Sequence, residues 1–124
     1  MDAPPPLHEL ETEIMEEMWG RAEATVREVQ VALNARGEKT RAYTTLLTVM
    51  TRLDRKGFLD RRREGKRDVY VAAVEEEAYR RARSEAEVDA LVDAYGDLAL
   101  AQFARRFSKL DPSHQRALQR RAAE

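Results

Sequence analysis

Residues 41–56, inside the stretch TRAYTTLLTVMTRLDRKG, combine short hydroxyls and guanidinium groups on one side of a predicted helix. At about 100° of rotation per residue, four apolar residues fall on one face: Leu46, Val49, Met50 and Leu53. The opposite face is polar and carries Arg41, Thr44, Thr48, Thr51 and Arg55, with Thr45 and Arg52 at its edge. One face of this helix therefore suits a core, and the other suits a polar partner.

Threonine is a mediocre helix former, so several threonines on an exposed helix face reduce stability. Their hydroxyls can reach a base edge or a phosphate in the major groove of DNA, and their methyl groups can touch thymine. The neighbouring arginines can neutralise phosphates. The alternative is a neutral solvated face. Leu47 lies between the two faces, where it either contacts a thymine methyl or packs into the core.

The elements around this helix must hold it in place. Two further helices precede it, at residues 7–19 and 26–36, and the second opens with the capping box Thr25 and Glu28. Two short strands follow, at residues 58–61 and 69–71. Three helices and a hairpin in this order predict a winged helix-turn-helix, a mainly α fold with a small β-hairpin.

The predicted hairpin is basic, with its turn at Glu64-Gly65-Lys66. Its cations are Arg61, Arg62, Arg63, Lys66 and Arg67. As a wing it would lie along the DNA backbone or in the minor groove, and we expect Arg62, Lys66 and Arg67 to contact DNA. The alternative is a solvated basic turn.

The net charge of −1 hides an uneven distribution. Residues 36–67 carry eleven Lys or Arg and four Asp or Glu, a net charge of +7. The segments before and after this block have net charges of −6 and −2. A central basic block in an acidic chain indicates a local anionic partner.

The tail from residue 75 onward changes character. A long helix is predicted over residues 75–95, Gly96 interrupts it, and Asp111-Pro112 opens a last short helix. Large apolar residues recur along the tail, yet it is too short to form its own core, so we expect it to pair with a second copy. The predicted dimer residues are Leu91, Tyr95, Leu100, Phe103, Phe107 and Leu110.

The predicted organisation has three parts: a stiff, disordered lead-in at residues 1–6, a winged-helix domain at 7–74 and a dimerisation region at 75–124. The absence of cysteine excludes disulfides and thiolate metal sites and suits a cytoplasmic location. No apolar run approaches the roughly 18 residues of a membrane span, and the N-terminus does not resemble a secretory signal.

An enzyme is the competing class of function. His8 and His114 lie at opposite ends of the sequence, and neither has a metal-ligand partner three or four residues away. There is no cysteine nucleophile and no phosphate-binding glycine motif, so we expect no catalytic residue, metal or cofactor. A winged-helix module that binds proteins without specific DNA readout is the other alternative, and the +7 block argues against it.

Four stretches carry a family resemblance: LETEIMEEMW, TVREVQVAL, AYTTLLTVMTRLDRKGFL and VYVAAVEEE. They resemble the penicillinase repressor family of BlaI/MecI type over residues 7–118. The resemblance implies a dimeric winged-helix transcriptional repressor whose C-terminal helices form the dimer. It also implies operators that are inverted repeats built around TACA and TGTA.

The resemblance further implies which residues face DNA: Thr44, Thr45, Leu47, Thr48 and Arg52. Leu47 stands where the staphylococcal members have an arginine. In members linked to a β-lactam sensor, a protease cuts between an Asn and a Phe, and the matching position here is Gln102-Phe103. Copper-responsive relatives have a cysteine-rich tail, which this chain lacks.

Overall fold

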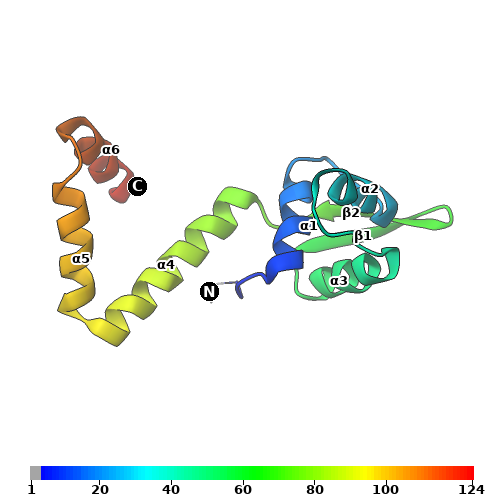
Figure 1. The fold of residues 1–124 in the computed structure, drawn as a ribbon, viewed down its shortest axis with the longest axis horizontal. Coiled ribbons are helices and arrows are strands. Elements are labelled where there is room, and N and C mark those ends of the chain that lie inside the picture. Colours follow the sequence, from blue (N-terminus) through cyan, green and yellow to red (C-terminus); the bar gives the residue numbers. More distant parts are fainter. Residues whose placement is uncertain (1–3) are drawn as a thin grey trace. The chain divides into compact units, whose positions relative to one another are not determined.

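The computed structural model describes residues 4–124 and forms two compact units, the first ending at Arg83 and the second running from Ser84 to Glu124 (Figure 1). Residues 1–3, half of the predicted lead-in, lie outside the described residues. The elements in chain order are α1 (Glu9–Trp19), α2 (Val26–Arg36), α3 (Tyr43–Arg55), β1 (Leu59–Glu64), β2 (Arg67–Ala72), α4 (Glu76–Tyr95), α5 (Asp97–Ser108) and α6 (Pro112–Ala122).

The first two helices begin where local hydrogen bonds satisfy their free backbone N–H groups. In α2 the Thr25 hydroxyl accepts from Glu28 N at 3.2 Å, and the helix has the predicted bounds. Helix α1 starts at Glu9, two residues later than predicted, because the backbone N–H of His8 donates to Glu11 Oε1 at 3.0 Å. Capping therefore decides where α1 begins, more than its apolar pattern does.

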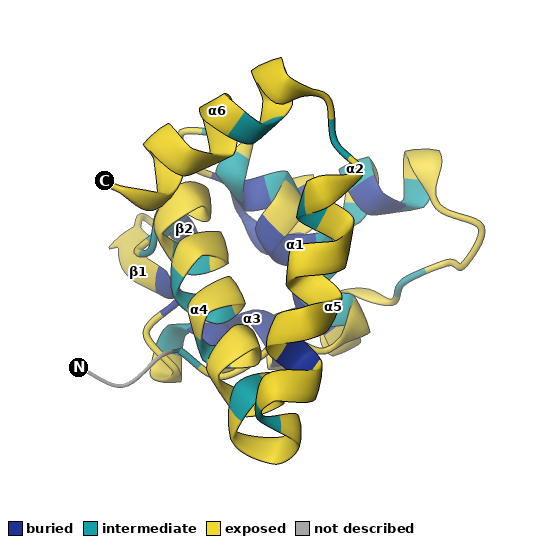
Figure 2. Cartoon of the chain, turned by 90° about the vertical axis from the view of Figure 1, so that its left-hand side faces the viewer, coloured by how far each residue is buried: buried dark blue, intermediate teal, exposed yellow. Residues whose placement is uncertain are grey.

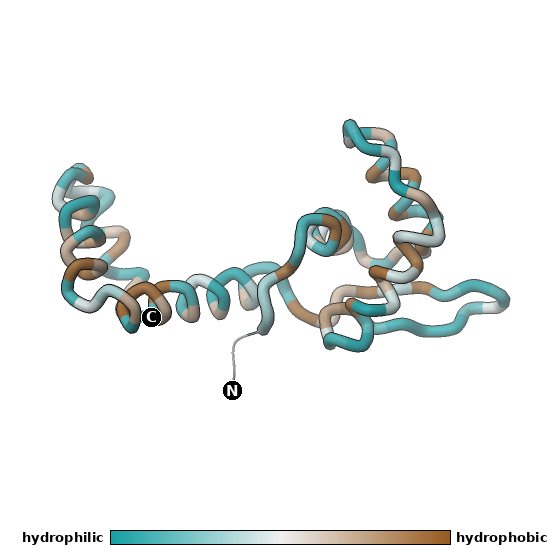
Figure 3. The backbone as a smooth tube through the Cα atoms, turned by 60° about the horizontal axis from the view of Figure 1, so that its bottom comes forward, coloured by the Kyte–Doolittle hydropathy of each residue, from teal (hydrophilic) through white to brown (hydrophobic). Residues whose placement is uncertain are grey.

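Strands β1 and β2 pair in antiparallel register from Leu59 with Ala72 to Glu64 with Arg67. Both are longer than predicted, because backbone pairing continues through the arginine-rich segment up to a tight turn. Gly65 in that turn has φ +65°, a conformation that glycine adopts readily. The hairpin projects beyond the helices of its unit in Figure 1, and its outer part is hydrophilic in Figure 3.

A third backbone segment joins the hairpin. Ala24, just before α2, pairs with Tyr70 of β2 through hydrogen bonds of 3.0 and 2.8 Å. This bridge, which no local sequence pattern predicts, fixes the start of α2 against the base of the hairpin. The side chains of both residues are buried.

One apolar core holds the first unit together. Helices α1 to α3 and both strands contribute buried side chains, among them Ile14, Met18, Val29, Leu46, Met50, Leu53, Leu59 and Tyr70. The predicted apolar face of α3 is buried in this core. Because that face is fixed inward, the threonine-bearing face of the same helix must point outward.

The first turns of α4 belong to the first unit. Tyr79 packs on Trp19 and Phe58, with ring centroids 5.7 and 5.6 Å apart, and its hydroxyl accepts from the backbone N–H of Leu7 at 3.1 Å. Trp19 Nε1 donates to the carbonyl of Val74 at 2.8 Å. The division between the two units therefore lies inside α4, later than the predicted boundary after residue 74.

The second unit contains the rest of α4 together with α5 and α6. Gly96, at φ +57°, separates α4 from α5, and the three helices make few contacts with one another. Ala99 is the single buried residue among residues 84–124. In Figure 2 most of α5 and α6 has the colour of exposed residues. One copy of this unit therefore has almost no core of its own.

Candidate nucleic-acid interface

The outward face of α3 presents the predicted base-reading residues to solvent. Thr44, Thr45, Thr48 and Arg52 are all exposed. The hydroxyl of Thr48 donates to the carbonyl of Thr44 at 3.0 Å, one turn earlier in the helix. Because a hydroxyl also has two acceptor lone pairs, Thr48 can still accept a hydrogen bond from a base amino group.

Leu47 is half-buried and packs against the core of the first unit. Its other side lines a groove together with Tyr43. In the free protein Leu47 therefore takes the packing role. A contact with a thymine methyl stays a prediction.

Arg41 does not share the threonine face, so its predicted placement was wrong. Helix α3 begins only at Tyr43, and the backbone of Arg41 is held by Asn34, whose side chain accepts from its N–H at 2.7 Å and donates to its carbonyl at 3.1 Å. The guanidinium group forms an ion pair with Glu13 of α1, and the side chain is only 18% exposed. Residues of α1 and α2 thus fix Arg41 toward the body of the unit.

The wing cations are exposed but are largely engaged with nearby carboxylates. Arg62 forms ion pairs with Glu23 and Glu64, and Arg67 lies 3.9 Å from Glu64. Within the described part of the chain, Lys66 has no ion pair. Glu23 lies outside the basic block of the sequence, so the +7 count overstated the positive charge of the wing. Lys66 is the wing cation that is most available to a phosphate.

This difference predicts unequal effects for two wing substitutions. Lys66→Ala should weaken binding to all DNA sequences and reduce the slope of log affinity against log salt by about one, since one phosphate contact is lost. Arg62→Ala should reduce the slope by less, because the charge of Arg62 is already partly offset by Glu23. Affinities measured at salt concentrations from about 50 to 200 mM test both. Equal reductions would mean that Arg62 leaves Glu23 when DNA binds.

A groove of about 540 Å³ lies between the starts of α2 and α3 and the hairpin. Arg27 and Tyr43 line it, with the guanidinium carbon of Arg27 5.2 Å from the centre of the Tyr43 ring. Arg63, Lys66 and Arg67 line its hairpin side. The sequence patterns did not single out Arg27, because nothing in its local spacing indicates that it meets the first residue of α3.

A partly buried ion pair anchors the far end of α3. Glu11 of α1 is almost fully buried, and its Oε2 atom accepts a hydrogen bond from Nζ of Lys56, the residue after α3, at 2.8 Å. Burial alone would raise the pKa of Glu11. The hydrogen bonds from Lys56 and from the backbone of His8 outweigh burial and lower the pKa below its ordinary value of 4.5.

The lowered pKa predicts a pH-dependent contribution to stability. Glu11→Gln should reduce the free energy of unfolding by about 1–2 kcal/mol at neutral pH, because the charge-assisted bond to Lys56 is lost. Since the folded-state pKa is lowered, the carboxylate stabilises fully above about pH 4.5, and this stabilisation is lost as the pH falls further. Urea unfolding of both proteins at about pH 7 and about pH 3 measures this. Glu16→Gln, an exposed position on α1, is the control, and a difference that persists unchanged in acid would contradict the prediction.

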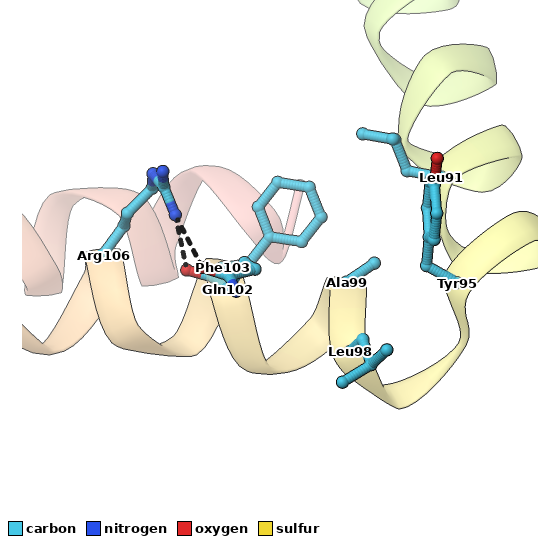
Figure 4. A pocket seen from close by; sticks show the side chains of 7 residues that line it. All are labelled: Leu91, Tyr95, Leu98, Ala99, Gln102, Phe103 and Arg106. Carbon is cyan, nitrogen blue, oxygen red and sulfur yellow. Dashed lines mark hydrogen bonds between the residues drawn. The ribbon is translucent and has the colours of Figure 1, made fainter.

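The second unit presents the predicted dimer residues as an apolar surface. Leu91, Tyr95, Leu100 and Phe103 are exposed, whereas Phe107 and Leu110 are half-buried. A cavity of about 490 Å³ opens between the end of α4 and α5, and Phe103 and Leu91 point into this angle (Figure 4). Leu98, which is 72% exposed and also lines the cavity, was missed because it lies outside the predicted stripe.

The candidate cleavage position lies inside α5. The carbonyl and side-chain oxygens of Gln102 both accept hydrogen bonds from Arg106 at 3.3 Å (Figure 4). The bond between Gln102 and Phe103 is therefore part of a continuous helix.

Two kinds of feature are absent from the described residues. Between residues 4 and 124, no cluster of three or more His, Cys, Asp or Glu side chains is arranged to hold a metal ion. In the same part of the chain, no helix combines the length and the apolar character that a membrane crossing requires.

Comparison with known proteins gives matches to one family. The family described as Penicillinase repressor matches residues 7–124. The Transcriptional regulator BlaI of Mycobacterium tuberculosis, from strains CDC 1551 / Oshkosh and ATCC 25618 / H37Rv, is 44% identical over 54 residues. Those residues are 43% of this chain and 38% of the relative, so the match spans well under half the length of these relatives.

Two solved structures are similar to a large part of this chain. The solution structure of the DNA binding domain of the repressor BlaI has 29% sequence identity and a TM-score of 0.53, covering 64% of this chain and 94% of that one. The solution structure of the monomeric form of Bacillus licheniformis BlaI in complex with the blaP half-operator has 29% identity, a TM-score of 0.51 and the same coverage. The predicted winged helix-turn-helix with a helical tail is confirmed.

The family match extends over nearly the whole described chain, whereas each structural match covers 64% of it. The protein belongs to the penicillinase repressor family, a family of transcriptional regulators and not of enzymes.

Proposed function

We propose that this chain is a dimeric transcriptional repressor that binds operator DNA built as an inverted repeat. The observation that carries the proposal is the outward face of α3, where Thr44, Thr48 and Arg52 are exposed opposite a buried apolar face. The groove and the hairpin place Arg27 and Lys66 beside that face. This arrangement puts phosphate-binding cations next to hydroxyls that can read bases.

The similar structure of Bacillus licheniformis BlaI with its half-operator supports DNA as the partner. By this proposal α3 lies in the major groove, with Thr44, Thr45, Leu47, Thr48 and Arg52 toward the bases. The wing residues Arg62, Lys66 and Arg67 lie toward the DNA backbone. Arg41, which is paired with Glu13, is given no DNA contact in this proposal. A partner of this kind implies action in the cytoplasm.

The second unit supplies the joint between two copies. Its exposed apolar residues around the cavity of α4 and α5 are what a second copy would cover. Each half-site alone gives few phosphate contacts and weak binding at physiological salt. Two linked copies bind an inverted repeat far more tightly, because the second half-site binds within the same complex.

Proteolysis at Gln102-Phe103 is the proposed route of induction, with a sensor-linked protease as partner. Proteases bind their substrates in an extended form, so α5 must open locally before the bond can be cut. With Ala99 as the one buried residue among residues 84–124, such opening costs little in a single copy. Cutting would split the joint and leave the DNA-reading face of α3 intact.

Binding to a labelled duplex tests the proposed function. The duplex carries TACA and TGTA half-sites one helical turn apart, and a scrambled duplex of the same composition is the comparison. We expect a preference for the repeat of roughly 10³-fold or more at physiological salt. Equal affinity for both duplexes would contradict sequence reading. Absence of binding even at low salt, about 50 mM, would favour the alternative, a winged-helix module that binds proteins.

A further inference from the structure

The second unit separates its charges along the chain. Residues 84–97 contain five acids and no Lys or Arg, whereas residues 105–121 contain six cations and one acid, Asp111. The acidic stripe, defined here as Glu85, Asp89 and Asp93, repeats every four residues along one side of α4. The basic cluster, defined as Arg105, Arg106 and Lys109, lies at the end of α5.

These two charged sets do not neutralise each other within one copy. All six side chains are exposed, and none of them forms an ion pair among the described residues, 4–124. Over the same range, Arg105 and Arg106 donate to Gln102 and to no carboxylate. The charges are thus available to a partner.

The acidic stripe also works against its own helix. The C-terminal end of a helix carries a partial negative charge and favours cations. The last turn of α4 contains no basic residue, and Asp93 lies in it. Asp93 therefore reduces the local stability of that turn, and no cation in the turn offsets the loss.

Both charged sets border the apolar surface that the proposed dimer would bury. On α4 Glu85 and Asp89 lie near Val88, at the edge of the apolar stripe of Val88, Leu91 and Tyr95, and Asp93 is turned further away from that stripe. On α5 Arg106 lines the same cavity as Phe103 and Leu91 (Figure 4). Burying the apolar side chains against a partner would bring the charges of both sets to the rim of the interface.

We propose that the occupant of this surface is a second copy docked with the acidic stripe of one chain facing the basic cluster of the other. This inference rests on the proposed dimer and specifies how its two halves meet. In a two-fold dimer the same pairing occurs twice, so both acidic stripes and both basic clusters are neutralised. Docking stripe against stripe would instead bring six carboxylates together, which like-charge repulsion opposes.

Charge reversal with mixing tests this arrangement directly. The first variant carries Glu85→Lys, Asp89→Lys and Asp93→Lys, and the second carries Arg105→Glu, Arg106→Glu and Lys109→Glu. Each variant alone faces like charges twice, so its dimer dissociation constant should rise about tenfold or more. Mixed together, the two variants have opposite charges at both contacts and should form a heterodimer with near wild-type affinity. Sedimentation and native mass spectrometry, without DNA, distinguish the species.

Two controls keep the result interpretable. Glu16→Lys, Glu38→Lys and Asp60→Lys together change the charge of the first unit equally and should leave the dimer unchanged. The second control replaces the basic cluster by neutral residues that preserve the helix: Arg105→Gln, Arg106→Gln and Lys109→Gln. This variant replaces the charge-reversed one if the reversed α5 fails to fold. Its dimer should weaken less with added salt than the wild-type dimer does.

The outcomes separate this inference from the proposed function. If Phe103→Ala gives monomers while the reversed variants self-associate like the wild type, the dimer stands and the facing of charges is overturned. If reversing the basic cluster weakens DNA binding but leaves the dimer dissociation constant unchanged, the cluster binds DNA. The inference is then again overturned. If the wild-type chain is itself monomeric, the proposed dimer is wrong.

Discussion

Phe103→Ala should convert the protein from a dimer to a monomer at low micromolar concentration and abolish operator binding. Phe103 is 42% exposed in one copy and lines the cavity between α4 and α5. Truncating an aromatic side chain that a partner buries costs about 3–5 kcal/mol. This raises the dissociation constant of the dimer by roughly two to four orders of magnitude. Sedimentation measures the mass, and binding to the inverted repeat measures the function.

The DNA-binding unit itself should survive this substitution. Its core residues belong to the first unit, and Phe103 is not among them. The circular dichroism and the binding to a single half-site should therefore remain close to wild type. Val31→Ala is the matched control, since Val31 is a 62% exposed apolar residue of α2 outside the tail. If the Phe103→Ala protein stays dimeric, the interface lies elsewhere and cleavage at Gln102 would not act by splitting it.

The helices could be predicted from the sequence because their signals are local. The apolar stripe of α3, the Thr25 cap of α2 and the Gly96 break each depend on residues within a few positions of one another. The side of α3 that faces outward follows from the same stripe. Short-range patterns of this kind are therefore enough to predict the fold class and the threonine face.

The parts that escaped prediction are contacts between segments far apart in the chain. Glu13 draws Arg41 away from the threonine face, and Glu23 pairs with Arg62 of the wing. Neither acid is near its partner in the sequence, so neither a helix projection nor a count of charges over a window reveals the pair. The bridge between Ala24 and Tyr70 escaped for the same reason.

Thr48→Val should reduce affinity for the operator by about 1–3 kcal/mol per half-site and leave affinity for scrambled DNA nearly unchanged. Valine has the shape of threonine, so the surface that meets the groove keeps its form. What is lost is an oxygen that accepts from a base, together with the bond to the Thr44 carbonyl. That internal bond adds little stability in a helix, so unfolding should change little.

Thr12→Val separates these two losses. The hydroxyl of Thr12 donates to the carbonyl of His8, four residues earlier, at 2.9 Å, as the hydroxyl of Thr48 does to Thr44. Thr12, however, belongs to α1 and not to the threonine face of α3. We expect Thr12→Val to match Thr48→Val in urea unfolding and to bind the operator like the wild type. Equal losses of Thr48→Val on operator and scrambled DNA would assign its hydroxyl to a phosphate. Base reading would then have to come from Thr44, Thr45 and Arg52, three further exposed side chains of that face.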